Sequence, residues 1–408
     1  MSDTSDTSDT SEASQRVGEP VASSSSTHAG ITPAPPAVDA APPVLLRGTD
    51  WAEADGMTSD FLRDVLQAET LVVLTGLGTS IGVKTTAGEA PTMPALLDAV
   101  KALPSFAAVE TSLSVESKGD DTNAGNVESL LSEAILANTL RPSERWQAFI
   151  DAAERTVLAK CQFVLPNTPL PHHERLLRAV ARRSPKLPRT QLFTTNYDMA
   201  FETAASTTRT MLVDGFSWSG TPTFDGSWFD IDFVRKLPGR TSVPEQNVVH
   251  LLKLHGSVDW DQHGSRVTRA NGHPAQPVLI YPAQNKYQLS YRQPYQEMMA
   301  RLQVALRQPS VGLLVIGYGF HDAHINAPIE SAIRSNVNLK MAAVAPNLQT
   351  VEPDSIPAAM EQLIRAGDDR FALIAGTFED AVTLLPTLEQ GDDRDEHVER
   401  VALVMDER

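Results

Sequence analysis

The sequence predicts an α/β fold in which an open parallel sheet carries helices on both faces and receives a helical insertion. Five short apolar runs have the length of buried strands, and each ends in a cluster of small or polar residues. The runs lie at residues 71–74, 191–193, 248–254, 311–316 and 341–345. Ligands of open α/β sheets bind beyond the carboxyl ends of the strands, so the five clusters are expected to face one crevice.

The first segment, residues 1–44, is predicted to be a disordered tail. A Ser-Asp-Thr tripeptide repeats from Ser2, serines fill 23–26, and residues 33–43 are rich in proline and alanine. The segment lacks the basic start and apolar centre of a signal peptide, and no run in the chain approaches the roughly 18 apolar residues of a spanning helix. We therefore expect a soluble, cytoplasmic protein without a membrane partner.

Composition and charge narrow the class of function. With 408 residues, 41% of them hydrophobic, the chain is long enough for one large or two ordinary domains. The formal net charge of -17 argues against a broad surface that neutralises phosphates, and so against direct nucleic-acid binding. Cys161 is the only cysteine, which rules out an intrachain disulfide and a thiolate zinc cage. We expect no zinc and a reducing compartment.

A helix at 60–68 is predicted to lead directly into the first strand. From 94 to 185 the pattern is mainly helical, with Asn126 as the expected cap of a helix at 127–137 and a second helix at 144–160. This block is far longer than a simple crossover. We interpret it as an inserted domain that lids the crevice, with a structural cap as the alternative.

The main domain, predicted at 45–389, also contains two irregular stretches. Residues 218–226 and 262–277 are rich in turn-forming residues and are expected to be surface loops. The last segment, 390–408, is highly charged with a modest apolar face. It is expected to be a terminal helix or an oligomer contact.

The first polar cluster is rich in glycine. Gly76, Gly78 and Gly82 follow the first strand and would let the backbone approach a pyrophosphate, to which amides at the next helix start could donate. This favours a Rossmann-like sheet. The spacing G-x-G-x-x-x-G, and a Glu89 that does not close a second strand, argue against an ordinary dehydrogenase. A tight turn that binds nothing is the alternative interpretation of this loop.

The strand ends carry short motifs in a fixed order. They are Thr-Gly-Leu-Gly-Thr-Ser at 75–80, Thr-Thr-Asn-Tyr-Asp at 194–198, Leu-His-Gly-Ser at 254–257, Gly-Tyr-Gly at 317–319 before Asp322, and Ala-Pro-Asn at 345–347. Together they resemble the Gly-Ala-Gly-x-Ser loop, the Thr-Gln-Asn-x-Asp motif, the catalytic His-Gly and two later strand ends of the sirtuin-like family, named for the silent information regulator proteins. The resemblance spans about 71–378 and implies an NAD-binding catalytic domain.

Departures from the eukaryotic deacylase pattern are informative. Leu77 stands where alanine is usual, Thr195 replaces glutamine, and Ala-Pro-Thr-Met at 90–93 takes the place of Pro-Asp-Phe-Arg. The four-cysteine zinc module is absent from the sequence. The pattern instead resembles the prokaryotic branch found in antiphage defence, whose members hydrolyse NAD, and Asn-Val-Glu-Ser-Leu-Leu-Ser at 126–132 looks like a helix of that branch.

The chemistry of NAD cleavage assigns roles to three residues. Breaking the nicotinamide–ribose bond develops oxocarbenium character, and the leaving pyridine is already cationic, so it needs no proton. The site must hold the ribose and position a water, which suits Asn196 as a neutral donor and acceptor and His255 as a base. Asp198 either orients Asn196 or the ribose hydroxyls, or caps the following helix. The alternative for His255 is an ordinary structural histidine.

The residues expected to bind NAD lie at the same strand ends. They are Gly76, Gly78, Thr79, Ser80, Thr194, Gly317, Gly319 and Asn347. No metal ligand is expected. His321 and His324 follow the Gly317 loop at helical spacing, but no carboxylate-rich set of ligands accompanies them in the sequence.

The resemblance implies an NAD hydrolase that releases nicotinamide and ADP-ribose and acts as a latent antiphage effector by depleting NAD. Two other classes stay open. One is an NAD-dependent deacylase or ADP-ribosyltransferase, and the other is a non-catalytic sensor of NAD or ADP-ribose, against which Asn196 and His255 argue. Related defence proteins act with a separate HerA-type ATPase, which implies such a partner. We expect a homo-oligomer, latent until activated, because an uncontrolled cytosolic NAD hydrolase would poison its host.

Overall fold

The computed structural model describes residues 42–119, 125–218, 220–236, 242–279, 293–388 and 401. The predicted tail at 1–44 and the charged segment at 390–408 lie almost wholly outside the described residues. Among the described residues, no helix combines the length and the apolar character needed to cross a membrane.

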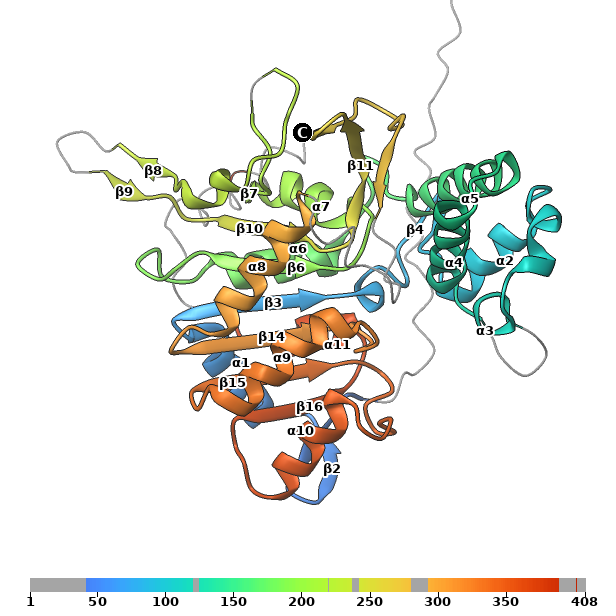
Figure 1. Ribbon diagram of the computed structural model, residues 1–408. Coiled ribbons are helices and arrows are strands. Elements are labelled where there is room, and N and C mark those ends of the chain that lie inside the picture. Colours follow the sequence, from blue (N-terminus) through green and yellow to red (C-terminus); the bar gives the residue numbers. More distant parts are fainter. Residues whose placement is uncertain are drawn as a thin grey trace, which may run out of the picture. The chain divides into compact units, whose positions relative to one another are not determined.

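The core of the molecule is a nine-stranded sheet (Figure 1). In spatial order its strands are β2 (Asp50–Glu53), β1 (Val44–Arg47), β16 (Phe371–Ala375), β15 (Leu339–Val344), β14 (Val311–Ile316), β3 (Thr70–Thr75), β6 (Thr190–Thr194), β10 (Val248–Lys253) and β7 (Met211–Val213). All neighbours pair in parallel except β2 with β1 and β1 with β16. The predicted α/β class with a parallel sheet is confirmed.

The five predicted strands are neighbours in this sheet and end level with one another. Thr75 of β3 pairs with Ile316 of β14 on one side and with Thr194 of β6 on the other. Thr194 in turn pairs with Lys253 of β10, and Ile316 with Val344 of β15. Parallel strands in this register present their carboxyl ends at one edge, so the polar clusters meet there as expected.

Helices cover both faces of the sheet. Alternate side chains of β3 enter two separate cores, because Val72 and Leu74 join one and Leu71 and Val73 the other. The first core includes α8 (Tyr295–Leu306), α9 (Ala323–Ser335) and α10 (Ile356–Arg365), which lie in front of the sheet in Figure 1. The second includes α1 (Gly56–Gln67), α6 (Pro171–Ala181), α7 (Ala200–Thr208) and α11 (Phe378–Leu384). Because both faces of the sheet are buried, the sequences of its central strands are almost continuously apolar.

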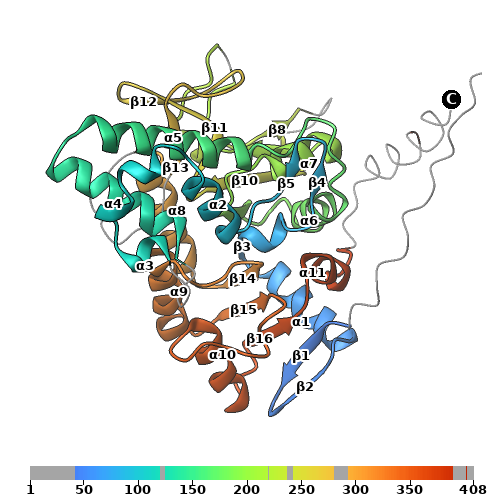
Figure 2. The same ribbon diagram turned by 90° about the vertical axis from the view of Figure 1, so that its right-hand side faces the viewer.

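The helical insertion packs around a third core, which also includes Val258. Its helices are α2 (Met93–Lys101), α3 (Val115–Lys118), α4 (Val127–Leu140) and α5 (Glu144–Cys161), with short turns η2 (Phe106–Ala108) and η3 (Glu110–Ser112). They gather beyond the carboxyl end of β3 (Figure 1 and Figure 2). Asn126 caps α4 as predicted, since its Oδ1 accepts hydrogen bonds from the amides of Glu128 and Ser129 at 2.8 and 3.3 Å. α6 packs with the sheet helices instead.

A small antiparallel sheet follows β10. It consists of β11 (Gly256–His263), β12 (Arg266–Arg269) and β13 (Pro277–Leu279), with β11 in the centre. The stretch 262–277, predicted to be a surface loop, therefore contains a strand. The reason is that Val267 of β12 is buried in the same core as Trp260 of β11, whereas turn-forming residues surround Val267 in the sequence.

Three further pieces of the described chain are short. The hairpins β4 (Lys84–Thr85) with β5 (Gly88–Glu89) and β8 (Val234–Arg235) with β9 (Val243–Pro244) are isolated pairs. The segment η4 (Gly226–Asp230) carries Trp228, whose ring centroid lies 4.7 Å from that of Trp218.

The contact between β14 and α1 yields a test of the fold. A Cβ atom at Gly312 would lie 1.9 Å from the carbonyl oxygen of Val65, so Gly312→Ala must push α1 away from the sheet. We expect a loss of about 1–3 kcal/mol in the free energy of unfolding, measured by urea denaturation. Gly56→Ala is the matched control, because nothing lies within 4 Å of its Cβ position. Equal stability of the two variants would contradict this packing.

Candidate active site

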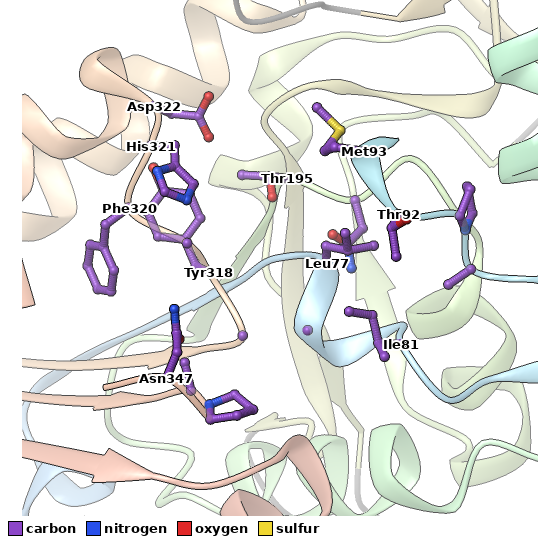
Figure 3. A pocket seen from close by; sticks show the side chains of 18 of the residues that line it. Leu77, Ile81, Thr92, Met93, Thr195, Tyr318, Phe320, His321, Asp322 and Asn347 are labelled. Atoms are coloured by element: carbon purple, nitrogen blue, oxygen red, sulfur yellow. The ribbon is translucent and has the colours of Figure 1, made fainter. Parts of the chain in front are cut away.

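A pocket of about 560 Å³ opens at the carboxyl edge of the sheet. At this edge, β3 has β14 on one side and β6 on the other. The strand order changes direction here, which makes this the topological switch point of an open α/β sheet. All five predicted strand ends contribute to the lining of the pocket, through Gly78, Asn196, His255, Gly317 and Asn347. In Figure 3, Leu77, Ile81, Thr92 and Met93 face Tyr318, Phe320, His321, Asp322 and Asn347 across it, with Thr195 between them.

The helical insertion forms part of the pocket wall. Asn126 and Glu128 at the start of α4, Leu96 of α2 and Cys161 of α5 line it together with residues of the sheet. Burial raises the pKa of the Cys161 thiol to about 12, so this group stays protonated at neutral pH and is no nucleophile.

The first glycine loop is held against the loop that follows β14. A Cβ atom at Gly76 would lie 2.8 Å from the carbonyl oxygen of Gly317, and one at Gly78 would lie 2.5 Å from its Cα. The amide of Gly78 donates to Gly317 O at 2.9 Å, while those of Thr79 and Ser80 donate within the loop, to Gly76 O and Leu77 O. The glycines are thus required by backbone packing. The amides of Gly78, Thr79 and Ser80 are already used in these bonds, and the turn η1 (Leu77–Thr79) stands in place of the expected helix start.

Asn196 is fixed by this same loop. Its Nδ2 lies 2.9 Å from Gly76 O, 3.1 Å from Thr79 Oγ1 and 2.9 Å from Ser80 Oγ, while its amide donates to Thr194 Oγ1. Acceptors around Nδ2 determine the orientation of the side-chain amide. Because the side chain also lines the pocket, Oδ1 is the polar atom that it offers there.

Asp198 forms hydrogen bonds with two segments of the site. Its Oδ2 accepts a hydrogen bond from Ser80 Oγ at 2.7 Å, and Ser80 in turn holds Asn196. Its Oδ1 accepts from the amide of Ala200 at 2.9 Å, at the start of α7. The carboxylate therefore joins Ser80, which holds Asn196, to the first residue of α7, whose N-cap is Met199.

His255 lies two residues beyond β10 and is 3% exposed. A sharp turn at Gly256, with φ of +91°, leads from it into β11, and a Cβ atom there would lie 2.1 Å from the carbonyl oxygen of Val278. The Nε2 atom of His255 is 3.4 Å from Nε2 of His324 in the first turn of α9. The ring of Tyr197 lies beside it, with centroids 6.4 Å apart.

The structure separates the predicted site residues into two layers. Gly78, Asn196, Asp198, His255, Gly317, Gly319 and Asn347 line the pocket. Gly76, Thr79, Ser80 and Thr194 lie behind them, where they bond to Asn196 or Asp198. The second set supports the site, and its members are positioned to hold the first set in place.

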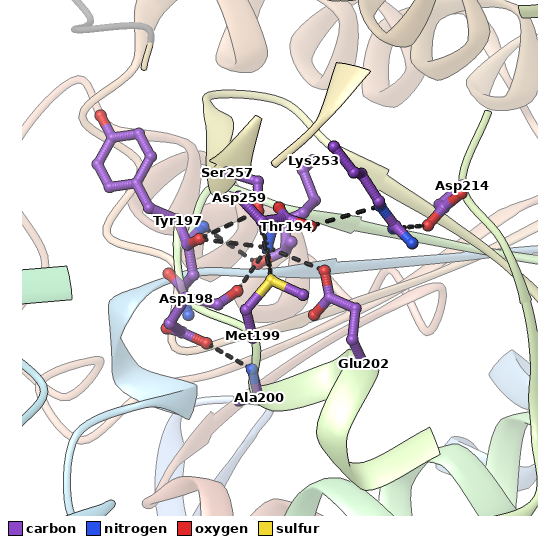
Figure 4. Close-up of polar contacts among 12 residues, drawn as sticks. Thr194, Tyr197, Asp198, Met199, Ala200, Glu202, Asp214, Lys253, Ser257 and Asp259 are labelled. Atoms are coloured by element: carbon purple, nitrogen blue, oxygen red, sulfur yellow. Dashed lines mark hydrogen bonds and ion pairs between the residues drawn. The ribbon is translucent and has the colours of Figure 1, made fainter. Parts of the chain in front are cut away.

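Sequence reasoning missed Lys253, the last residue of β10, which is buried behind the site (Figure 4). Its Nζ donates to the carbonyl oxygens of Tyr197 and Asp198 and to Ser257 Oγ, and pairs with Glu202 Oε1 at 3.0 Å. These contacts fix the segment that carries Asn196. The signal was present in the sequence, because a lysine between the apolar residues of a buried strand requires buried partners.

The carboxyls near Lys253 share a desolvated environment. Burial raises the pKa of Glu202, an effect that Lys253 opposes, and burial likewise raises that of Asp214, which pairs with Arg269. Arg269 also lies 3.4 Å from Asp259. Each cation in this cluster thus offsets the cost of burying a neighbouring carboxylate.

Removal of the Lys253 charge provides a test. Lys253→Met leaves Glu202 and two carbonyl oxygens without their cation, so we expect about 3–5 kcal/mol lower unfolding free energy in urea at neutral pH. Adding Glu202→Gln should recover part of this loss, because the buried negative charge is then removed as well. A double variant that is less stable than Lys253→Met alone would contradict the assigned pairing.

Part of the chain is similar to a known protein family. Residues 190–363 match the model of the SIR2-like domain, a region that includes Asn196, His255 and Asn347 but not the first glycine loop. Among solved structures, the chain is similar to one described as a crystal structure of a Sir2 homolog–NAD complex, with 14% identity, a TM-score of 0.38, and coverage of 86% of this chain and 97% of that chain. No curated protein matches the chain. The similarity to the SIR2-like domain is thus limited to residues 190–363.

Proposed function

We propose that the chain is an NAD hydrolase that cleaves the bond between nicotinamide and ribose to give nicotinamide and ADP-ribose. The observation that carries this proposal is the convergence of Asn196, Asp198 and His255 on one pocket at the switch point of the sheet. These residues lie within the region that matches the SIR2-like domain. The pocket volume of about 560 Å³ falls in the roughly 300–1,000 Å³ range of small-molecule sites.

In the proposed reaction, a water oxygen bonds to the anomeric carbon of the ribose while the carbon–nitrogen bond breaks. The bonding pair leaves with the nicotinamide nitrogen, which becomes neutral, and the water gives its proton to the imidazole of His255. Asn196 Oδ1 accepts a hydrogen bond from the water or a ribose hydroxyl. Ser80 and Asp198 hold the Asn196 amide in this orientation, and Lys253 fixes the backbone beneath it.

Substitution of the two reacting groups tests the mechanism. His255→Ala and Asn196→Ala should each lower nicotinamide release by about a hundredfold or more, because each removes a group that acts mainly in the transition state. His273→Ala, which alters an exposed histidine between β12 and β13, is the matched control and should retain activity. Near-normal release by a well-folded His255→Ala or Asn196→Ala protein would sink the mechanism.

Products distinguish the other functions that the sequence leaves open. Free ADP-ribose beside nicotinamide supports hydrolysis, whereas O-acyl-ADP-ribose formed from an acylated peptide would identify a deacylase. ADP-ribose bound to a protein would identify a transferase. Binding of NAD without any nicotinamide release, in the presence of every partner, would identify a sensor.

For the wider role, we propose a latent cytoplasmic effector of antiphage defence that acts as a homo-oligomer, together with a separate HerA-type ATPase. The support is the sequence resemblance and the risk that a constantly active NAD hydrolase poses to its host. Mass photometry combined with NAD turnover tests it. A monomer that is fully active alone would contradict the proposal.

A further inference from the structure

We propose that His255, Asp322 and His324 form a binding site for a divalent transition-metal ion of the Zn²⁺ type, open to the pocket. One donor atom from each of the three side chains lies within 4.8 Å of the others. His255 and Asp322 also line the pocket itself. The site is therefore distinct from a structural zinc module and is accessible to an ion from the solvent side.

The distances fit metal coordination. The two Nε2 atoms are 3.4 Å apart. Two nitrogens bound to Zn²⁺ at tetrahedral angles and ordinary bond lengths lie about 3.3 Å apart. The spacing of the imidazoles thus suits two ligands of one metal ion, and a carboxylate oxygen of Asp322 lies within 4.8 Å of both.

The fold brings these ligands together from two segments. His255 follows β10, and the turn at Gly256 sets its position. Asp322 and His324 belong to the loop and first turn that connect β14 to α9. Asp322 occupies the N-cap position of α9, yet its side chain makes no capping hydrogen bond. One oxygen of this carboxylate lies within 4.8 Å of a ring nitrogen of each histidine, so the carboxylate is on the side of the histidines.

The electrostatic surroundings favour a cation. Within the described part of the chain, the pocket lining includes the carboxylates of Glu128, Asp198, Asp322 and Glu352 and no lysine or arginine. Two imidazoles and one carboxylate suit Zn²⁺ and related ions, whereas Mg²⁺ prefers oxygen ligands. Three protein ligands leave a fourth position for water or a ligand oxygen in the pocket.

Direct metal binding is the test. The full-length chain, without a histidine tag and stripped of metal, is titrated with Zn²⁺ against a chromogenic chelator in the absence of NAD. We expect one Zn²⁺ per chain, at least tenfold weaker binding after His324→Ala or Asp322→Asn, and no displacement by Mg²⁺. His321→Ala is the matched control, since His321 lines the same pocket but stands outside the group.

Three results would overturn the proposal. They are an absence of stoichiometric Zn²⁺ binding, an affinity that His324→Ala leaves unchanged in a folded protein, and an equal loss after His321→Ala. After any of these results, the short distance between His255 and His324 would be explained by a hydrogen bond in which one ring donates to the other. Circular dichroism of each variant confirms that the folded state is retained.

A consequence for catalysis rests on the proposed function. An ion on His255 occupies the proposed base, so Zn²⁺ should suppress nicotinamide release by the wild-type chain, and a chelator should restore it. His324→Ala should shift the inhibition to at least tenfold higher Zn²⁺. The two proposals fail separately: a metal-free wild-type chain that never releases nicotinamide refutes the hydrolase, while the titration without NAD decides the metal site.

Discussion

The site depends on a backbone contact between two loops that belong to neighbouring strands. Gly76 and Gly78 after β3 meet Gly317 after β14, and side chains at these positions would collide with backbone atoms. The same contact sets the floor of the pocket, because the switch point lies between these strands. Since Asn196 Nδ2 lies against Gly76 O, a shift of the first loop would also turn the candidate catalytic amide. The loop contact that the fold requires therefore also determines the geometry of the site.

A second layer of buried polar groups stiffens this arrangement. Ser80 joins Asp198 to Asn196, and Lys253 holds the carbonyl oxygens of the same segment from below. A buried polar group without a hydrogen-bond partner destabilises the fold, whereas a paired one restricts the orientation of the groups that it joins. The cluster therefore gives the segment from 194 to 198 a single orientation that apolar packing alone would not specify.

The sequence predicted those features that short-range patterns determine. Strands buried on both faces read as apolar runs, so the five central strands and their common edge were found, while the start of α1 at Gly56 preceded the expected position. The strand β12 was missed because Val267 is its only apolar residue, so no apolar run marks the strand in the sequence. Lys253 was passed over although its setting in an apolar strand was visible. Either His321 or His324 could lie near His255, depending on the orientation of α9 at the edge of the sheet. The spacing of these residues in the sequence does not give that orientation.

The two uses inferred for His255 exclude each other at any one moment. A neutral imidazole has one ring nitrogen with a free lone pair, because the other carries the proton. Acceptance of a proton from water and coordination of a metal ion both require that lone pair. His324 adds a third claim on the same ring, since its Nε2 is at hydrogen-bond distance. Loss of the metal ion or of the hydrogen bond would favour proton transfer to His255. Under the two proposals, the state of the histidine pair would therefore link the ion content of the pocket to its capacity for hydrolysis.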